Sequence, residues 1–335
     1  MTFATLPDRR AEGSPSGPAL QDGSHSLDNR SLLAWVQAVA EQLAEAGVGR
    51  GDVVAAKLTN RVEFVVVMFA AWRVGAALTP INPALTDSET LHQLRDSGAR
   101  LTVVEAVTEG HPDGPLELPV DNLRRAPQGS PAAPVIDVDA LALLIYTSGT
   151  TGTPKGVMLD HSNLLGMTRM GTSALALTPQ DRCLLILPLF HVNGIVVSIL
   201  LTLETGGSVV IAPRFNPTSF FTVVEEHQPT FFSAVPTILA FLQGLPASVK
   251  PGTKSLRFVI CGAAPAPAKL LGAFEKRFGV PVLEAYGLSE GTCGSTINPL
   301  DGERRAGTVG RAFPGQELRI TGEDGGLVPT GDVGE

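Results

Sequence analysis

The stretch LALLIYTSGTTGTPKG, residues 141–156, places an apolar run directly before a loop of unusual composition. Residues 141–146 are apolar enough for a buried β-strand. Residues 147–156 consist mainly of Ser, Thr and Gly, and end in Pro154, Lys155 and Gly156. Glycines let a ligand approach backbone N–H groups, hydroxyls add donors, and lysine suits phosphate oxygens. The stretch therefore predicts a polyphosphate-binding loop at the end of a strand.

The loop is not a Walker A motif. Pro154 stands where the pattern G-x4-G-K-[ST] requires a second glycine after Gly149, and Gly156 follows the lysine. The alternative is an exposed turn of Ser, Thr and Gly. Ten consecutive residues of this kind behind a buried strand favour the binding loop.

Strand and helix patterns alternate on both sides of this stretch. Ser31 is a candidate N-cap before apolar residues at helical spacing, and capping-box pairs occur at Asn60–Glu63 and Thr86–Glu89. Such alternation predicts an α/β fold, with helices packed on largely parallel sheets and ligands bound beyond the carboxyl ends of the strands. Strands are predicted at 53–58, 76–81, 101–105, 183–187, 208–211, 230–234, 256–261 and 281–286.

Composition restricts the class of protein. The 335 residues allow two domains, and the net charge of −8 lacks the basic excess of proteins that bind nucleic acid or anionic membranes. Three distant cysteines support neither a disulfide framework nor a zinc site. We find no signal peptide and no apolar run of ~18 residues, so we expect a cytoplasmic protein without a membrane span. Residues 1–26 are expected to be a flexible lead-in, with order beginning near Leu27.

Several further blocks resemble one known family. TSGTTGTPKG resembles the signature loop of the AMP-binding, adenylate-forming superfamily, and the other blocks follow in the family's order. The similarity is greatest to the acyl-CoA synthetase (ligase) branch, and it implies two helix-flanked β-sheet subdomains in a layered αβαβα arrangement. The blocks are LTPINP (78–83), LPLFHVNG (187–194), CGAAPAP (261–267), EAYGLSE (284–290) and GTVGRAFPGQELRI (307–320).

The resemblance implies a two-step reaction that consumes ATP. A carboxylate attacks the α-phosphate of ATP to give an acyl-adenylate, and the thiol of coenzyme A then displaces AMP. Carboxylates are already ionised at neutral pH, so the site must mainly neutralise charge rather than supply a base. Glu290 resembles the residue that helps to hold Mg²⁺, and Ser289 stands in place of the family's usual threonine. The residues implied to hold the β- and γ-phosphates are Lys155 and the loop residues Thr147, Ser148, Gly149, Thr150, Thr151 and Gly152.

The later blocks imply a nucleotide pocket and an acyl pocket. Tyr286 and Gly287 lie in the block whose aromatic residue stacks on adenine, and Glu284 and Ala285 occupy positions that contact the adenine edge. The small residues Gly262, Ala263 and Ala264 leave room for the base. His191 resembles a position near the substrate carboxylate, where it orients or gates the acid. The alternatives from the residues alone are a core aromatic for Tyr286, a strand-to-helix turn for 261–267 and a packed core residue for His191.

The resemblance also implies domain boundaries. Residues 27–180 are expected to form the first α/β subdomain and 181–335 an incomplete second one, with the family's C-terminal lid domain absent. Asp332 in PTGDVGE is expected in a surface turn rather than in the family's ribose-binding motif. On this basis the chain as given is expected to be weakly active or inactive.

Three functions remain open at this point. The first is an ATP-dependent ligase that joins a fatty or other apolar carboxylic acid to coenzyme A. The second is an adenylating enzyme that loads an acyl-carrier protein or another nucleophile. The third is a noncatalytic nucleotide-binding fragment, against which Lys155 and Glu290 argue.

Overall fold

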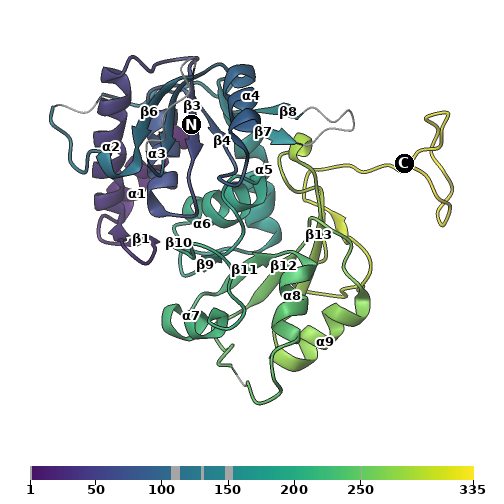
Figure 1. The fold of residues 1–335 in the computed structure, drawn as a ribbon. Coiled ribbons are helices and arrows are strands. Elements are labelled where there is room, and N and C mark those ends of the chain that lie inside the picture. Colours follow the sequence, from purple (N-terminus) through teal and green to yellow (C-terminus); the bar gives the residue numbers. More distant parts are fainter. Residues whose placement is uncertain (1, 107–113, 130–131, 148–153, 250) are drawn as a thin grey trace.

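Two β-sheets and the helices around them make up the described part of the chain, residues 2–106, 114–129, 132–147, 154–249 and 251–335 of a computed structural model (Figure 1). The five segments include no helix that is long and apolar enough to cross a membrane.

The first sheet has six strands in the order β6-β5-β3-β4-β7-β8. All neighbours are parallel except β7 and β8, which form an antiparallel hairpin. The predicted strands of this half are confirmed with small shifts of their ends, whereas β6 and β8 were not predicted. The strands are β3 (Val53–Lys57), β4 (Ala77–Pro80), β5 (Ala99–Val104), β6 (Leu116–Pro119), β7 (Leu141–Thr147) and β8 (Lys155–Asp160).

The second sheet has nine strands in the order β15-β14-β13-β12-β11-β9-β10-β1-β2. From β13 to β1 all neighbours are parallel, and antiparallel strands close both ends. The strands are β1 (Pro18–Gln21), β2 (Ser26–Asp28), β9 (Arg182–Leu185), β10 (Ser208–Ile211), β11 (Phe231–Ala234), β12 (Phe258–Cys261), β13 (Val282–Tyr286), β14 (Thr296–Ile297) and β15 (Arg311–Ala312).

Helices cover both faces of both sheets. Successive strand residues belong to different cores, because their side chains alternate between faces: Cys183 and Leu185 lie in the core shared by the two sheets, and Leu184 lies under the outer helices. Helix α3 is buried on every side, as expected of the middle layer. The helices are α1 (Leu6–Gly13), α2 (Asn29–Glu45), α3 (Val62–Arg73), α4 (Asp87–Ser97), α5 (His161–Ala174), α6 (Leu201–Glu204), α7 (Phe220–His227), α8 (Pro236–Gln243) and α9 (Ala268–Phe278), with shorter turns η1 (Phe3–Thr5), η2 (Val120–Asn122) and η4 (Ser289–Gly291) and a π-helix η3 (Gly194–Leu200).

The layers follow from these cores. Helix α4 packs outside the first sheet, where Leu94 meets Ala55 and Ile81. Helices α2, α3 and α5 and the η3–α6 segment contribute to the large core that both sheets share, and α7, α8 and α9 cover the far face of the second sheet. The α/β class and the layered αβαβα arrangement are confirmed.

The N-terminal segment differs from the flexible lead-in that composition predicts. Residues 3–13 form η1 and α1, and β1 joins the second sheet beside β10. Phe3 and Leu6 are fully buried in the shared core. Order therefore begins well before Leu27, and β1 and β2 belong to the sheet built mainly from residues after 181.

Arg10 ties this segment to the body of the protein. The buried guanidinium donates to the side chain of Asn29 at 2.7 Å and to the carbonyl oxygens of Leu203 at 2.5 Å, Gly207 at 2.8 Å and Pro18 at 3.1 Å. Burial lowers the pKa of Arg10 to about 10, and the charge of Glu204 acts in the opposite direction. One cation thus satisfies acceptors from four parts of the chain.

Helix capping matches the sequence at one site and differs at two. The Thr86–Glu89 capping box of α4 is confirmed. Helix α3 has no capping box at Asn60–Glu63. Instead, its first N–H group, that of Val62, donates a hydrogen bond of 2.9 Å to the carboxylate of Asp22 in the β1–β2 turn. Helix α2 is capped by Asp28 rather than by Ser31, whose N–H donates to that carboxylate. The α3 cap comes from 40 residues away, so local spacing could not reveal it.

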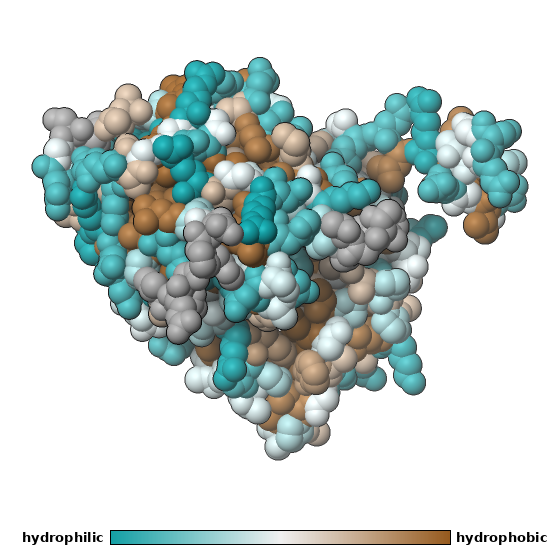
Figure 2. All heavy atoms as spheres, turned by 45° about the horizontal axis from the view of Figure 1, so that its top comes forward, coloured by the Kyte–Doolittle hydropathy of each residue, from teal (hydrophilic) through white to brown (hydrophobic). Residues whose placement is uncertain are grey.

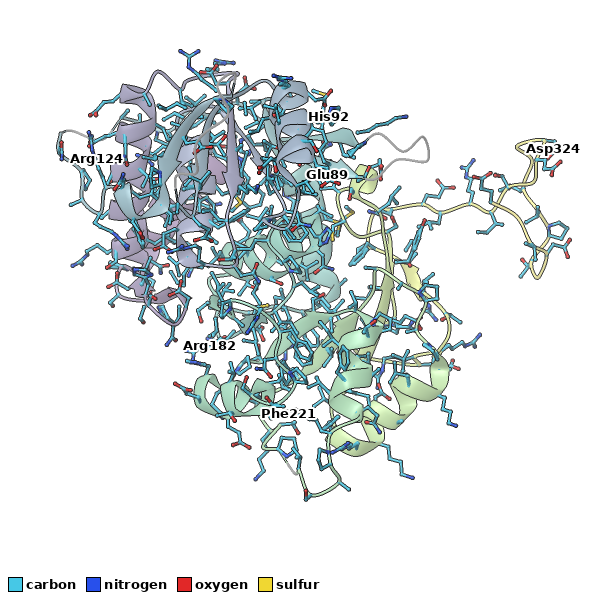
Figure 3. All side chains as sticks on the ribbon, viewed as in Figure 1. Glu89, His92, Arg124, Arg182, Phe221 and Asp324 are labelled. Atoms are coloured by element: carbon cyan, nitrogen blue, oxygen red, sulfur yellow. The ribbon has the colours of Figure 1, made fainter. Side chains whose placement is uncertain are left out.

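The C-terminal segment, drawn in yellow, extends away from the body (Figure 1). An isolated antiparallel bridge joins Thr321 to Leu327, and Asp324 lies near the tip (Figure 3). Asp332 is exposed in a turn in which its N–H donates to the carbonyl of Pro329.

Asp181 joins the starts of three strands of the second sheet. It precedes β9 and is nearly fully buried, and its carboxylate accepts from Arg257 at 2.6 Å, Thr230 at 2.7 Å and the N–H of Thr178 at 2.8 Å. Burial alone would raise the pKa of Asp181, but the hydrogen bonds from Arg257, Thr230 and Thr178 outweigh it and hold the pKa below its ordinary value.

We therefore expect part of the fold's stability to be lost in acid. A carboxyl group whose pKa is depressed on folding stabilises the protein above its unfolded pKa of about 4, and this contribution disappears as the pH falls through the lower folded pKa. Asp181→Asn should cost about 2 kcal/mol at pH 7, because the amide leaves buried donors unpaired, and should lessen the acid sensitivity. Urea midpoints measured from pH 7 to pH 2 test this, with the exposed Glu317→Gln as control. Equal pH dependence in all three proteins would contradict it.

Candidate active site

Strands β7 and β8 flank the segment that the sequence predicts to bind phosphates. Thr147 at the end of β7 pairs with Lys155 at the start of β8, so the two strands form an antiparallel hairpin. Lys155 is exposed and forms no ion pair with any described carboxylate. The other predicted loop residues, Ser148, Gly149, Thr150, Thr151 and Gly152, lie outside the described residues.

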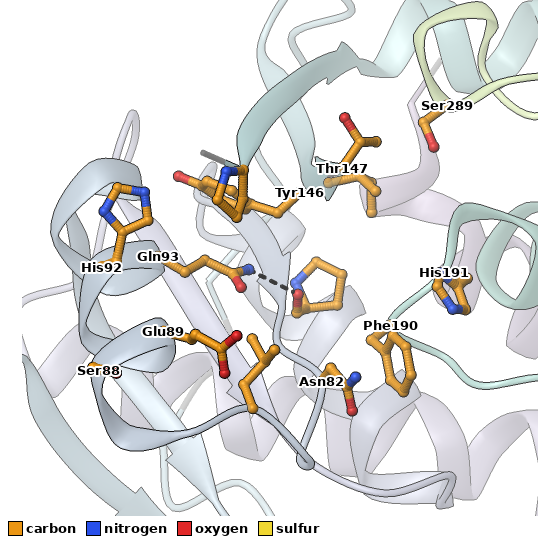
Figure 4. A pocket seen from close by; sticks show the side chains of 14 residues that line it. Asn82, Ser88, Glu89, His92, Gln93, Tyr146, Thr147, Phe190, His191 and Ser289 are labelled. Atoms are coloured by element: carbon orange, nitrogen blue, oxygen red, sulfur yellow. Dashed lines mark hydrogen bonds between the residues drawn. The ribbon is translucent and has the colours of Figure 1, made fainter. Parts of the chain in front are cut away.

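A cavity of about 740 Å³ lies beside this hairpin. Thr147 and Pro154 line it from the hairpin, Phe190 and His191 from the loop after β9, and Ser289 from η4 (Figure 4). We call it the polar cavity, because helix α4 and nearby residues add polar side chains to its wall. Its further lining residues are Pro80, Asn82, Leu85, Ser88, Glu89, His92, Gln93, Ile145 and Tyr146.

Glu290 lies next to this cavity, on η4 beside Ser289. Strand β8 contacts η4, so Lys155 and Glu290 occupy neighbouring elements, and both side chains are exposed. A cation and a carboxylate thus each follow a residue that lines the polar cavity, Lys155 after Pro154 and Glu290 after Ser289.

A second cavity of about 260 Å³ adjoins the first, and we call it the apolar cavity. His191 and Ser289 line both cavities, so the two spaces meet at these side chains. Seven predicted site residues line the apolar cavity: His191, Gly262, Ala263, Ala285, Tyr286, Gly287 and Ser289. Its other walls are Met167, Leu175, Val192, Asn193, Val196, Val197, Leu201, Ile260, Leu288, Cys293, Gly294, Ile297 and Phe313.

The π-helix η3 builds one wall of the apolar cavity. Its hydrogen bonds span five residues rather than four, so each turn is wider than in an α-helix. Val196 and Val197 of η3 line the cavity, together with Val192 just before the helix and Leu201 at the start of α6. The face of the protein seen in Figure 2 is mostly hydrophilic, and apolar side chains gather in a hollow near the centre of that face.

Small residues are required where backbone segments approach each other. A Cβ atom at Gly287 would lie 1.6 Å from the carbonyl oxygen of Cys293, and one at Gly262 would lie 2.9 Å from that of Ala285. Ala263 and Cys293 adopt positive φ angles of 65° and 93°, a region that L residues rarely occupy. Strained backbone of this kind is common at ligand-binding sites.

His191 lies at the junction of the two cavities. Its ring packs against Phe190 with a centroid distance of 4.5 Å. The side chain is accessible through the cavities, but the surrounding walls desolvate it and lower the pKa of His191. The imidazole is therefore neutral at pH 7 and can donate or accept a hydrogen bond.

Four of the predicted residues that the structure describes line neither cavity: Lys155 and Glu290, each of which follows a lining residue in the chain, and Glu284 and Ala264. Glu284 is buried, and its carboxylate accepts from the N–H of Gly307 at 3.1 Å. Ala264 is exposed beyond Ala263. The structure therefore brings together His191, Ala263, Tyr286 and their neighbours, and gives Glu284 a structural hydrogen bond.

Helix α4 also lines the polar cavity, although none of its residues was predicted to belong to the site. Glu89, His92 and Gln93 project from one face of this helix into the polar cavity, and Glu89 and His92 appear beside the β7–β8 hairpin in Figure 3. Their spacing of three and four residues was the available signal. Tyr146 connects this helix to the hairpin, because its hydroxyl donates a hydrogen bond of 2.6 Å to the carboxylate of Asp96 on α4. Burial and the Asp96 carboxylate raise the pKa of Tyr146.

Among the described residues, the one cluster of side chains that could ligate a metal ion lies away from these cavities. Asp22, His25 and Glu63 bring three ligand atoms within 4.8 Å of one another. Arg61 and Arg125 both pair with Glu63, at 3.0 and 3.4 Å. Guanidinium groups thus occupy both carboxylate oxygens of Glu63, and the oxygens of Asp22 already accept from the N–H groups of Ser24, His25 and Val62, so the cluster offers few free ligand atoms.

Comparison with known proteins agrees with this geometry. The family described as AMP-binding enzyme matches residues 7–335. The chain is 35% identical to a sulfoacetate–CoA ligase of Cupriavidus necator over 100% of this chain and 69% of the relative, and 34% identical to a feruloyl-CoA synthase of an Amycolatopsis species over 99% and 69%. An o-succinylbenzoate coenzyme A synthetase of Bacillus subtilis in complex with ATP and magnesium superposes with a TM-score of 0.90 at 30% identity, over 99% of this chain and 69% of that one. The chain belongs to the AMP-binding enzyme family, in its acid–CoA ligase branch.

Proposed function

We propose that this protein joins an apolar monocarboxylic acid to coenzyme A through an acyl-adenylate. The observation that carries the proposal is the meeting of the two cavities at His191 and Ser289. The triphosphate would lie at the end of the polar cavity lined by Thr147 and Ser289, away from the carboxylate of Glu89 on α4 (Figure 4), and the acid would lie in the apolar cavity. The reacting carboxylate and α-phosphate would then meet at the junction.

The phosphate side supplies charge and hydrogen-bond donors. Lys155, the hydroxyls of Thr147 and Ser289 and the backbone of the loop would hold the β- and γ-phosphates. Glu290 would provide one oxygen ligand to Mg²⁺, which usually keeps several waters and binds through one or two carboxylates together with substrate phosphates. A single exposed carboxylate next to the polar cavity fits this coordination. Bound Mg²⁺ would neutralise charge that builds up on the leaving pyrophosphate.

The nucleoside side is formed by the rim of the apolar cavity. Tyr286 is 48% exposed, so one face of its ring is available for stacking on adenine. Gly262 and Ala263 lie nearby and present little side-chain bulk. Glu284 would act indirectly, by holding the 307 region against the end of β13 through its bond to Gly307.

The walls of the apolar cavity favour an acid with one negative charge. None of its described lining residues is Lys, Arg, Asp or Glu. A second sulfonate or carboxylate on the substrate would lose its hydration there without gaining a cation. An apolar monoacid carries one negative charge, as ferulate does, whereas sulfoacetate carries two. The apolar part of such a monoacid has no charged group that would lose hydration in the cavity.

The first step needs no general base. A carboxylate oxygen attacks the α-phosphorus, the new bond joins acyl oxygen to phosphorus, and the bond to the bridging oxygen of pyrophosphate breaks. In the second step the thiol sulfur of coenzyme A bonds to the acyl carbon, AMP leaves with the former carboxylate oxygen, and the thiol proton goes to solvent. Neutral His191 would hydrogen-bond the carboxylate at the junction without adding charge.

Acid-dependent exchange of labelled pyrophosphate into ATP tests the proposal. We expect exchange with apolar monoacids, and at least tenfold less with dicarboxylic or sulfonated acids of similar length. Formation of a thioester with coenzyme A distinguishes the ligase from an enzyme that loads a carrier protein. ATP binding without exchange for any acid would indicate the noncatalytic alternative and contradict the proposal.

A further inference from the structure

We infer that Met167 closes the apolar cavity and sets the longest acid that the protein accepts. This inference rests on the proposed function, because it assigns the acid to that cavity. It concerns a residue on α5, outside the sequence blocks that carry the family resemblance.

One face of α5 forms the closed end of the cavity. Met167 and Leu175 both line it, and Gly171 lies between them on the same face, since residues four apart are neighbours on a helix. A Cβ atom at Gly171 would lie 2.8 Å from Cδ2 of Leu201, another cavity residue. The missing side chain therefore lets α5 approach α6 closely, and this contact fixes the distance of Met167 from the opposite wall.

The side chain of Met167 crosses to that wall. A Cβ atom at Gly294 would lie 3.3 Å from Cε of Met167 and 2.7 Å from a ring carbon of Phe313. The terminal methyl group, the ring and the Gly294 backbone thus meet at one point. Met167 is only 3% exposed, whereas Tyr286 and Leu288 at the rim are 48% and 43% exposed. The cavity is open at the rim and closed at Met167.

The size of the cavity supports a limit on chain length. Its volume of about 260 Å³ is below the roughly 300 to 1,000 Å³ of most ligand pockets. Methionine is unbranched and flexible and fills irregular gaps, so it closes the space without a rigid contact. Shortening it should extend the cavity along the direction of the acyl chain.

A graded series of variants tests the inference. Met167→Leu shortens the side chain by about one atom. Met167→Ala removes three heavy atoms, Cγ, Sδ and Cε. The probes are acyl-sulfamoyl adenosines, stable mimics of acyl-adenylates, with straight chains of increasing length. Calorimetry on the full chain measures their binding, so the readout does not depend on turnover.

We expect wild-type affinity to fall sharply beyond a certain chain length. This cutoff should move by about one carbon in Met167→Leu and by two or three in Met167→Ala, with at least tenfold tighter binding of the first chain that wild type rejects. Met170→Ala removes the same atoms from the same helix, at a residue that packs against the core outside the described cavity walls. It should keep the wild-type cutoff.

The outcomes separate the two proposals. If no probe of any length binds to wild type, the proposed function is wrong. If the probes bind but the cutoff is the same in wild type and in every Met167 variant that folds, the inference about Met167 is wrong. Gly294→Ala acts from the opposite wall and should shorten the cutoff, so the inference stays testable if Met167→Ala does not fold.

Discussion

Replacement of Arg10 by methionine is expected to destabilise the protein by about 3 to 5 kcal/mol, because four hydrogen bonds from one buried guanidinium are lost at about 1 kcal/mol each. The guanidinium serves the Asn29 side chain and the carbonyl groups of Leu203, Gly207 and Pro18. Methionine fills much of the space but donates no hydrogen bond, so each of these four acceptors loses a buried donor, and of them the Leu203 carbonyl still accepts from the N–H of Gly206. Urea unfolding followed by far-UV circular dichroism measures the loss.

Arg9 provides a matched control for this experiment. It pairs with Glu204 at 2.8 Å, and the two side chains are 30% and 26% exposed. Partly exposed ion pairs typically contribute at most about 1 kcal/mol, so Arg9→Met should change the midpoint little. If Arg10→Met were no less stable than Arg9→Met, the N-terminal segment would not be the integral part of the fold that the structure shows.

The N-terminal segment also shows what local sequence patterns cannot reveal. Its polar, glycine-rich composition predicts disorder, and only a few of its residues, such as Phe3, Leu6 and Leu20, are large and buried. What orders it is pairing with β10, almost 190 residues later, and the network around Arg10. By contrast, central strands such as β10 and β12 are continuous apolar runs, so their positions follow from the sequence alone.

In the candidate site, too, some residues could be identified from the sequence and others only from the packing of the helices. Motif residues such as His191, Tyr286 and Gly287 were identified from sequence, and the structure brings them to one cavity. The walls that determine which acid fits come from α5 and η3, whose residues are ordinary apolar ones in sequence. Their role depends on which helices pack together, and on close contacts such as that of Gly171 with Leu201. Glu284 shows the converse: its block suggests ligand contact, but its buried carboxylate is bonded to Gly307.

Replacement of Lys155 by methionine is expected to lower acid-dependent pyrophosphate exchange by roughly 100- to 1,000-fold, the range seen when one preorganised donor to developing charge is removed. Lys155 starts β8 opposite Thr147, directly after Pro154, which lines the polar cavity, and none of the described carboxylates pairs with it. Its charge is therefore available to the leaving pyrophosphate. Because that charge builds up as the bond to phosphorus breaks, kcat should fall more than the affinity for ATP.

Lys269→Met serves as the matched control, because Lys269 is an exposed lysine on α9, which covers the far face of the second sheet. It should leave both exchange and stability unchanged. Lys155→Arg should restore part of the activity, since it keeps the charge but changes its geometry. Urea midpoints should be the same for all three variants, because Lys155 is exposed and its loss removes no buried contact. Wild-type exchange by Lys155→Met would show that the hairpin does not bind the phosphates, and would leave the polar cavity without its proposed ligand.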